Sequence, residues 1–203
     1  MNDFLPKDYK EPESNYFKLK EGKNTFRVMS PAITGYEYWN TDNKPVRSKE
    51  PFKNTADIRV DKDGKPNRVK HFWAFIVWNI DAEVIQIMEI TQKTIQDDIK
   101  ALVNNEEWGD PKKYNITITR NGEGLNTKYV VMPSPHSDIS EQAHGTFTDI
   151  DINLDALYDG NNPFETEANF KPKMEKAMNT KVRKGIEVIE PTPELQADID
   201  ELY

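Results

Sequence analysis

Basic and aromatic residues gather in one part of this 203-residue chain, and together these two residue types suit the binding of a nucleic-acid strand. Nine Lys or Arg residues and four Asp or Glu residues lie between Lys44 and Lys70, which leaves a net charge of +5. Lys and Arg neutralise phosphates, and each base stacked on a flat side chain contributes about 1–3 kcal/mol whatever its sequence. The segment therefore predicts binding to single strands, because the bases of a duplex cannot reach such rings.

The candidate contacts of this interface are rings for the bases and cations for the phosphates. The candidate rings are Tyr36, Tyr38, Trp39, Phe52, Phe72, Trp73 and Trp78. The candidate phosphate contacts are Lys44, Arg47, Lys49, Lys53, Arg59, Arg68 and Lys70. Each ring has an alternative place in the hydrophobic core. Trp73 and Trp78 have opposite parity on one predicted strand, so at most one of them faces the main core.

The C-terminal end of the chain carries the opposite charge. Residues 186–203 contain six carboxylates and no Lys or Arg, and residues 134–203 have a net charge of −9. Residues 1–133 have a net charge of +1, so the whole-chain value of −8 conceals a weakly basic body. We expect the tail to compete with nucleic acid for the basic segment. Its expected contacts with protein partners are Glu194, Asp198, Asp200, Glu201, Leu202 and Tyr203.

The sequence lacks the residues or motifs that several kinds of catalysis and metal binding require. The chain has no Cys, which excludes disulfides, thiol catalysis and Cys-ligated zinc. Residues 149–155 space oxygen ligands as a calcium loop does, but Leu154 stands where that loop needs Gly. No phosphate-binding loop or nucleophile motif is present, so we expect a non-enzymatic protein without metal or cofactor. The longest apolar run has seven residues, Phe72–Trp78, so no membrane partner is expected.

The spacing of apolar residues predicts the elements that position these contacts. Alternation predicts strands over residues 25–29, 33–39, 71–80, 84–90, 114–120 and 127–132, the last one ended by Pro133 and Pro135. Ile95, Ile99, Leu102 and Val103 lie on one face of a helix, which Thr91 or Thr94 caps. Two further short helices are predicted, over residues 154–158 and 173–178.

A helix between the third and fourth strands of a small barrel is the order of an OB-fold. The predicted class is therefore mainly β with α, an OB-fold-like antiparallel five-stranded barrel with one intervening helix. The expected organisation is a flexible N-terminal arm (1–15), the barrel domain (16–160), a linker with a short helix (161–185) and a disordered acidic tail (186–203).

Five stretches resemble, in their order along the chain, single-stranded DNA-binding proteins of tailed bacteriophages. They are Phe17–Val28, Lys70–Asn79, Ile87–Ile95, Trp108–Pro111 and Tyr114–Met132, and the similarity covers about residues 15–135. The resemblance implies an OB-fold that protects single-stranded DNA during phage replication, recombination and repair in the cytoplasm of the infected bacterial host. It also implies replication and recombination partners, of phage or host, for the tail, and self-association on DNA. Some relatives hold a zinc through Cys and His, which a chain without Cys does not carry over.

Three other functions remain open from the sequence. A recombination mediator or annealing protein would also touch DNA but act as a large oligomer. A metal-dependent nuclease could use scattered Asp and Glu residues. A virion component would have no nucleic-acid role at all.

Overall fold

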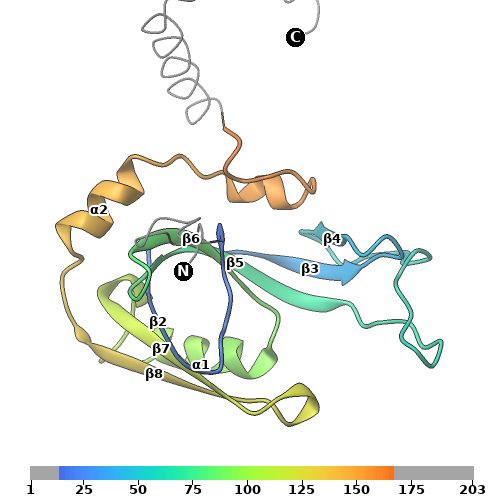
Figure 1. Cartoon of the computed structure of the whole chain (residues 1–203), viewed down its shortest axis with the longest axis horizontal. Coiled ribbons are helices and arrows are strands. Elements are labelled where there is room, and N and C mark those ends of the chain that lie inside the picture. Colours follow the sequence, from blue (N-terminus) through green and yellow to red (C-terminus); the bar gives the residue numbers. More distant parts are fainter. Residues whose placement is uncertain (1–13, 167–203) are drawn as a thin grey trace, which may run out of the picture. The chain divides into compact units, whose positions relative to one another are not determined.

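Eight strands and two α-helices make up the described part of the chain, which is residues 14–166 of a computed structural model (Figure 1). The strands are β1 (Tyr16–Phe17), β2 (Gly22–Val28), β3 (Ile33–Trp39), β4 (Pro45–Ser48), β5 (Lys70–Asn79), β6 (Val84–Ile90), β7 (Tyr114–Asn121) and β8 (Lys128–His136). The helices are α1 (Lys93–Val103) and α2 (Glu141–Thr148), with short 3-10 helices η1 (Pro111–Lys113), η2 (Gly124–Asn126) and η3 (Leu154–Leu157). The chain is mainly β with α, as predicted.

The strongest local patterns place their elements correctly. β3 and β6 have the predicted bounds, and α1 buries Ile95 and Ile99 on the predicted face. The N-cap of α1 is Gln92, which makes no capping hydrogen bond with its side chain, so capping by Thr91 or Thr94 is wrong. The predicted end of β8 is also wrong, because β8 runs on through Pro133 and Pro135 to His136. β8 is the last strand in the sheet order, and an edge strand tolerates proline because one side needs no N–H donors.

The strands form one mixed sheet in the order β1-β6-β5-β2-β7-β8. β3 continues the path of β2 beyond Pro31, and it pairs with β5 on one side and with β4 on the other. All pairings are antiparallel except the short parallel one between β1 and β6. The recorded pairings do not close the sheet on itself, since none joins β8 to β1 or β6 among the described residues. A closed barrel of five antiparallel strands is therefore not confirmed.

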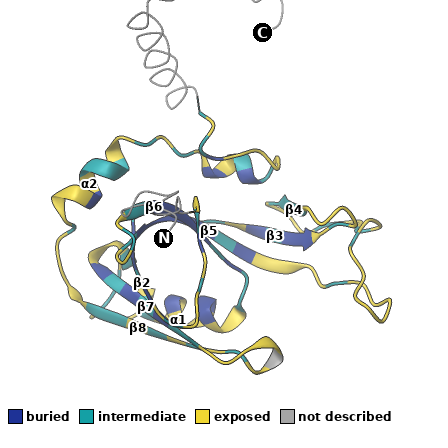
Figure 2. Cartoon of the chain, in the orientation of Figure 1, coloured by how far each residue is buried: buried dark blue, intermediate teal, exposed yellow. Residues whose placement is uncertain are grey.

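The two faces of β5 are buried by different parts of the chain (Figure 2). Phe75 and Val77 belong to the main core, together with Phe26 of β2, Ile116 of β7 and the buried face of α1. Phe72, Ala74, Ile76 and Trp78 have the other parity and are buried as well. Residues 137–163, which we call the strap, run past this second face with α2 packed against β6.

The strap belongs to the same compact unit as the sheet, and this unit ends at Pro163. η3 falls on the predicted helix at 154–158, whereas α2 had no prediction. The predicted helix at 173–178, most of the N-terminal arm and linker, and the whole acidic tail lie outside the described residues.

Candidate nucleic-acid interface

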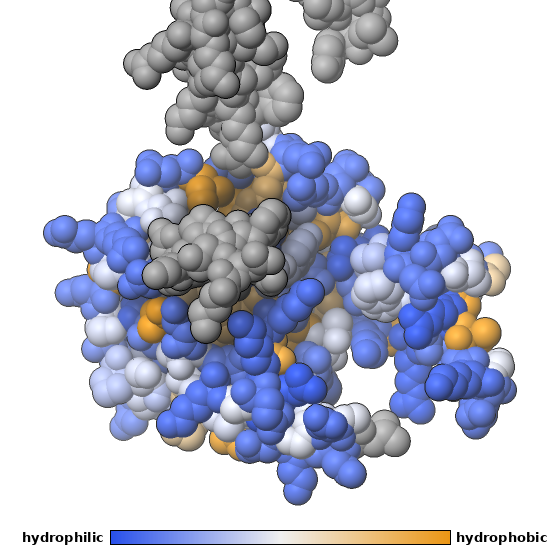
Figure 3. Space-filling view, viewed as in Figure 1, coloured by the Kyte–Doolittle hydropathy of each residue, from blue (hydrophilic) through white to orange (hydrophobic). Residues whose placement is uncertain are grey.

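The basic segment forms most of a projecting part of the sheet that we call the β3–β5 arm, residues 33–74 (Figure 1). β3 and β4 form a hairpin, and a second turn closes over Asp61–Lys65, where the Asp61 carboxylate accepts bonds from two backbone amides. Hydrophilic side chains cover most of the arm's surface in Figure 3, with a few hydrophobic ones among them.

Seven cations of the arm are exposed, and no salt bridge in the described region involves them. They outnumber the five exposed carboxylates, two of which already accept hydrogen bonds from Tyr38 or from backbone amides. The cations are Lys44, Lys53, Arg59, Lys62, Lys65, Arg68 and Lys70. The carboxylates are Asp42, Glu50, Asp57, Asp61 and Asp63. The arm therefore offers a surplus of positive charge to an anionic strand.

Arg47, one of the predicted phosphate contacts, is held in a buried ion cluster instead. Its Nε donates to Oε2 of Glu37 at 2.8 Å and its Nη2 donates to Oε2 of Glu89 at 2.9 Å. The Arg47 and Glu37 side chains are only 7% and 8% exposed. The guanidinium also lies 5.6 Å from the centre of the Phe72 ring. With its charge neutralised and its donors covered, Arg47 does not belong to the phosphate-binding set.

Glu89 forms the weaker of the two ion pairs in this cluster, and its protonation makes the stability of the protein depend on pH. Burial raises the pKa of Glu89, followed by repulsion from Glu37, although Arg47 opposes the shift. Its Oε1 atom is buried and has no hydrogen-bond partner among the described residues. The folded protein therefore binds a proton at Glu89 more readily than the unfolded chain does.

We expect the variant Glu89→Gln to lose this pH dependence. A raised pKa in the folded state contributes stability at and below the ordinary Glu value of 4.5, and the contribution disappears as pH rises through the folded pKa. Urea unfolding of both proteins at pH 5 and pH 8 measures it. The wild type minus variant difference in unfolding free energy should be larger at pH 5. An equal difference at both pH values would show that Glu89 titrates normally.

Lys49 lies at the foot of the arm and contacts the strap. Its Nζ is 2.9 Å from Oδ1 of Asp155 and 4.9 Å from the centre of the Tyr158 ring. The hydrogen bond with Asp155 raises the pKa of Lys49, and both partners are 64% exposed. Exposed pairs of this kind are weak, so Lys49 ties the strap to the arm only loosely.

Three of the predicted stacking rings are buried, and burial leaves them no free face for a base. Phe72 and Trp78 lie under the strap, where Phe72 meets the Tyr158 ring at 6.0 Å and Trp78 lies near Ala143. Tyr38 packs against Phe52 at 4.7 Å and donates to Asp57. These three residues are core, so their prediction as base contacts is wrong.

The remaining predicted rings are accessible, and two of them, Tyr36 and Trp73, share one face of the arm. Tyr36 of β3 is directly opposite His71 of β5, with ring centres 5.6 Å apart, and Trp73 is the next residue of β5 on that face. We call Tyr36, His71 and Trp73 the ring row. Trp39 is 44% exposed on the opposite face, and Phe52 is half-buried. His71 had no predicted role, although its place two residues before Trp73 puts both on the same side of the strand.

One hollow adjoins the ring row at Trp73, and a second hollow adjoins the first. The first is a mostly apolar hollow of about 330 Å³, walled by Trp73, Phe75 and Ile99. The second is a larger hollow of about 700 Å³ between the end of β2, η1 and α2. Val28 and Lys112 line both, so the two hollows are neighbours. Sequence patterns did not indicate either one.

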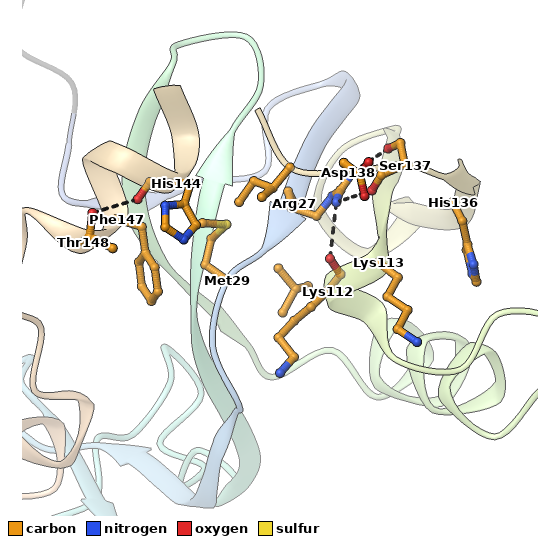
Figure 4. Close-up of a pocket in the computed structure, with 12 residues that line it drawn as sticks. Arg27, Met29, Lys112, Lys113, His136, Ser137, Asp138, His144, Phe147 and Thr148 are labelled. Atoms are coloured by element: carbon orange, nitrogen blue, oxygen red, sulfur yellow. Dashed lines mark hydrogen bonds between the residues drawn. The ribbon is translucent and has the colours of Figure 1, made fainter. Parts of the chain in front are cut away.

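Arg27 holds the wall of the larger hollow together through hydrogen bonds within the protein, so its guanidinium is not free to contact a bound molecule (Figure 4). Its guanidinium donates to Asn115 Oδ1, to the Lys112 carbonyl, and to the carbonyl and hydroxyl of Ser137, over 2.7–3.2 Å. These bonds hold η1 beside the first residue of the strap. His144 and Phe147 of α2 lie across the hollow, and His136 turns away to stack on Tyr114.

Comparison with protein-family models, with curated proteins and with solved structures finds no match for this chain. Within residues 14–166, no three His, Asp or Glu side chains are grouped closely enough to hold a metal ion. In the same region no helix is long and apolar enough to span a bilayer.

Proposed function

We propose that this protein binds single-stranded DNA without sequence preference and without catalysis. The observation that carries the proposal is the β3–β5 arm, which combines seven exposed cations outside the salt bridges of residues 14–166 with the accessible rings of the ring row and Trp39. Cations that follow the backbone together with stacking surfaces are the two requirements of sequence-independent single-strand binding.

The connectivity of the sheet supports an OB-fold interpretation. Taking β2 and β3 as one bent strand, the order β2/β3, β5, β6, α1, β7, β8 is that of an OB-fold, with its helix between the third and fourth strands. In this interpretation residues 40–69 of the arm, between β3 and β5, form the loop between the first two strands. That loop is one of the places where OB-folds grip oligonucleotides.

Two further features make up the proposal. The acidic residues of 186–203 are suited to compete with DNA for the arm, since a tethered competitor reaches a millimolar local concentration. Recruitment of replication and recombination proteins by this tail, self-association on DNA and a role in phage replication, recombination and repair rest on the resemblance described above.

A titration with labelled single-stranded and double-stranded DNA of the same sequence tests the proposal. Single strands should bind much more tightly, because only their bases can reach the rings. If four to seven of the arm's cations contact phosphates, log affinity should fall against log salt with a slope of about −3 to −5. Fluorescence anisotropy over a salt series measures both quantities.

Three results would count against parts of this proposal. Equal affinity for duplex at every salt concentration would show that the rings do not stack on bases. The absence of binding at low salt would favour a role without nucleic acid. A loss of the labelled strand when Mg²⁺ or Mn²⁺ is added would point to the nuclease alternative.

A further inference from the structure

The apolar hollow beside Trp73 has an accessible rim and a buried floor. Phe75 and Ile99 of the floor are 4% and 5% exposed, and Ala32, Val103 and Lys112 are exposed around the opening. The half-buried Trp73 forms one wall. Ligand sites in proteins are usually concave and mostly apolar with a few polar groups, and this hollow has that form.

The rim carries polar groups that match the edge of a base. Asp110 and Lys112 lie next to each other, with Oδ2 of Asp110 at 3.7 Å from Nζ of Lys112. A nucleobase has two apolar faces and a polar edge, so its faces fit Trp73 and the floor while its edge reaches this pair. At about 330 Å³, the hollow is at the small end of the range for ligand pockets and suits a single ring system.

The charges around the larger hollow favour an anionic neighbour for that base. Lys112 and Lys113 of η1 line it, against the single carboxylate of Asp138. Phe147 adds a half-buried ring on the α2 side. Lys112 lies between the two hollows, where a phosphate that follows a base in the first hollow would pass.

We propose that the hollow beside Trp73 accepts one unstacked base of a bound single strand, and that the strand's backbone passes over Lys112 into the larger hollow. The ring row leads to this hollow because Trp73 belongs to both. The inference rests on the proposed function and extends it, since it assigns a fixed pocket to one nucleotide outside the basic segment.

An abasic scan tests the pocket. We use the shortest oligothymidine that binds the full chain with undiminished affinity, and we move a single abasic site along it one nucleotide at a time. One position should lower affinity by about 5- to 100-fold, the value of one stacked base, and its neighbours should have smaller effects. A flat profile with normal wild-type binding would overturn the pocket and leave the proposed function standing. Failure of the wild type to bind any oligothymidine would remove both.

A variant in which a larger side chain fills the hollow provides a second test. Ala32→Phe places a ring at the rim of the hollow, and Ala101→Phe places the same ring on an exposed position of α1 that lines neither hollow. Ala32→Phe should weaken binding and abolish the position dependence of the abasic scan, while Ala101→Phe should change neither. If the Ala32→Phe protein binds DNA as tightly as the wild type, the hollow does not hold a base. The hollow then has another occupant, and this conclusion also holds if only the sedimentation of the variant differs from that of the wild type. If Ala32→Phe does not fold, the scan on the wild type still decides.

Two matched variants test whether the backbone of the strand passes over Lys112. Lys112→Ala should make the salt slope shallower by about 0.7, the value of one phosphate contact on a single strand. Lys100→Ala removes the same charge from an exposed position of α1 that lines neither hollow, and it should leave the slope unchanged. Equal slopes for the two variants would contradict the path.

Discussion

Replacing Arg47 with alanine should lower the free energy of unfolding by about 3–5 kcal/mol, the cost of removing one partner from a buried ion pair. Arg47 is the only cation that the described structure places against Glu37 and Glu89. Its removal leaves two carboxylates close together, with Glu37 only 8% exposed. Chemical denaturation followed by circular dichroism measures the loss.

A matched variant and a rescue separate this effect from DNA binding. Lys49→Ala, two residues away, removes an exposed ion pair and the contact with the Tyr158 ring, and it should cost less than about 1 kcal/mol. The cost of Arg47→Ala should shrink in a Glu37→Gln, Glu89→Gln background, where no buried charge is left alone. Folded Arg47→Ala should keep the wild-type affinity for single strands. A stable Arg47→Ala protein that bound DNA weakly would return Arg47 to the phosphate contacts.

Removing four cations from the β3–β5 arm should weaken single-strand binding by roughly 10²–10³-fold at 0.1 M salt. The variant replaces Lys44, Arg59, Arg68 and Lys70 with alanine, all of which are exposed and outside any recorded salt bridge of residues 14–166. Each lost phosphate contact makes the salt slope shallower by about 0.7, so four contacts together change it by about 2.8. The same anisotropy titration over a salt series gives affinity and slope together.

The control for this variant has the same change in net charge. Lys18, Lys20, Lys23 and Lys128 are exposed outside the arm, and their replacement with alanine removes four charges as well. This second variant should bind with nearly wild-type affinity and slope. If both variants weaken binding equally, general attraction by the whole surface explains the binding and the arm has no special role.

Local patterns in the sequence were sufficient for most of the secondary structure. Strand alternation and helical spacing depend only on neighbouring residues, which is why β3, β6 and the buried face of α1 were predicted correctly. The concentration of cations between Lys44 and Lys70 is likewise a property of the chain itself, and most of these cations are exposed in the structure.

The fate of each candidate contact depended on residues distant in the chain. Parity indicated that Phe72 and Trp78 share one face of β5, but only folding brings the strap, more than 60 residues further on, across that face. In the sequence, nothing distinguishes Arg47 from the other basic residues of its segment. The pairing of β3 with β4 and of β5 with β6 brings Glu37 and Glu89 beside it. β8 tolerates two prolines because it lies at an edge, which the sheet order decides. Burial, ion pairing and edge position are contacts between distant segments, so local sequence patterns do not contain them.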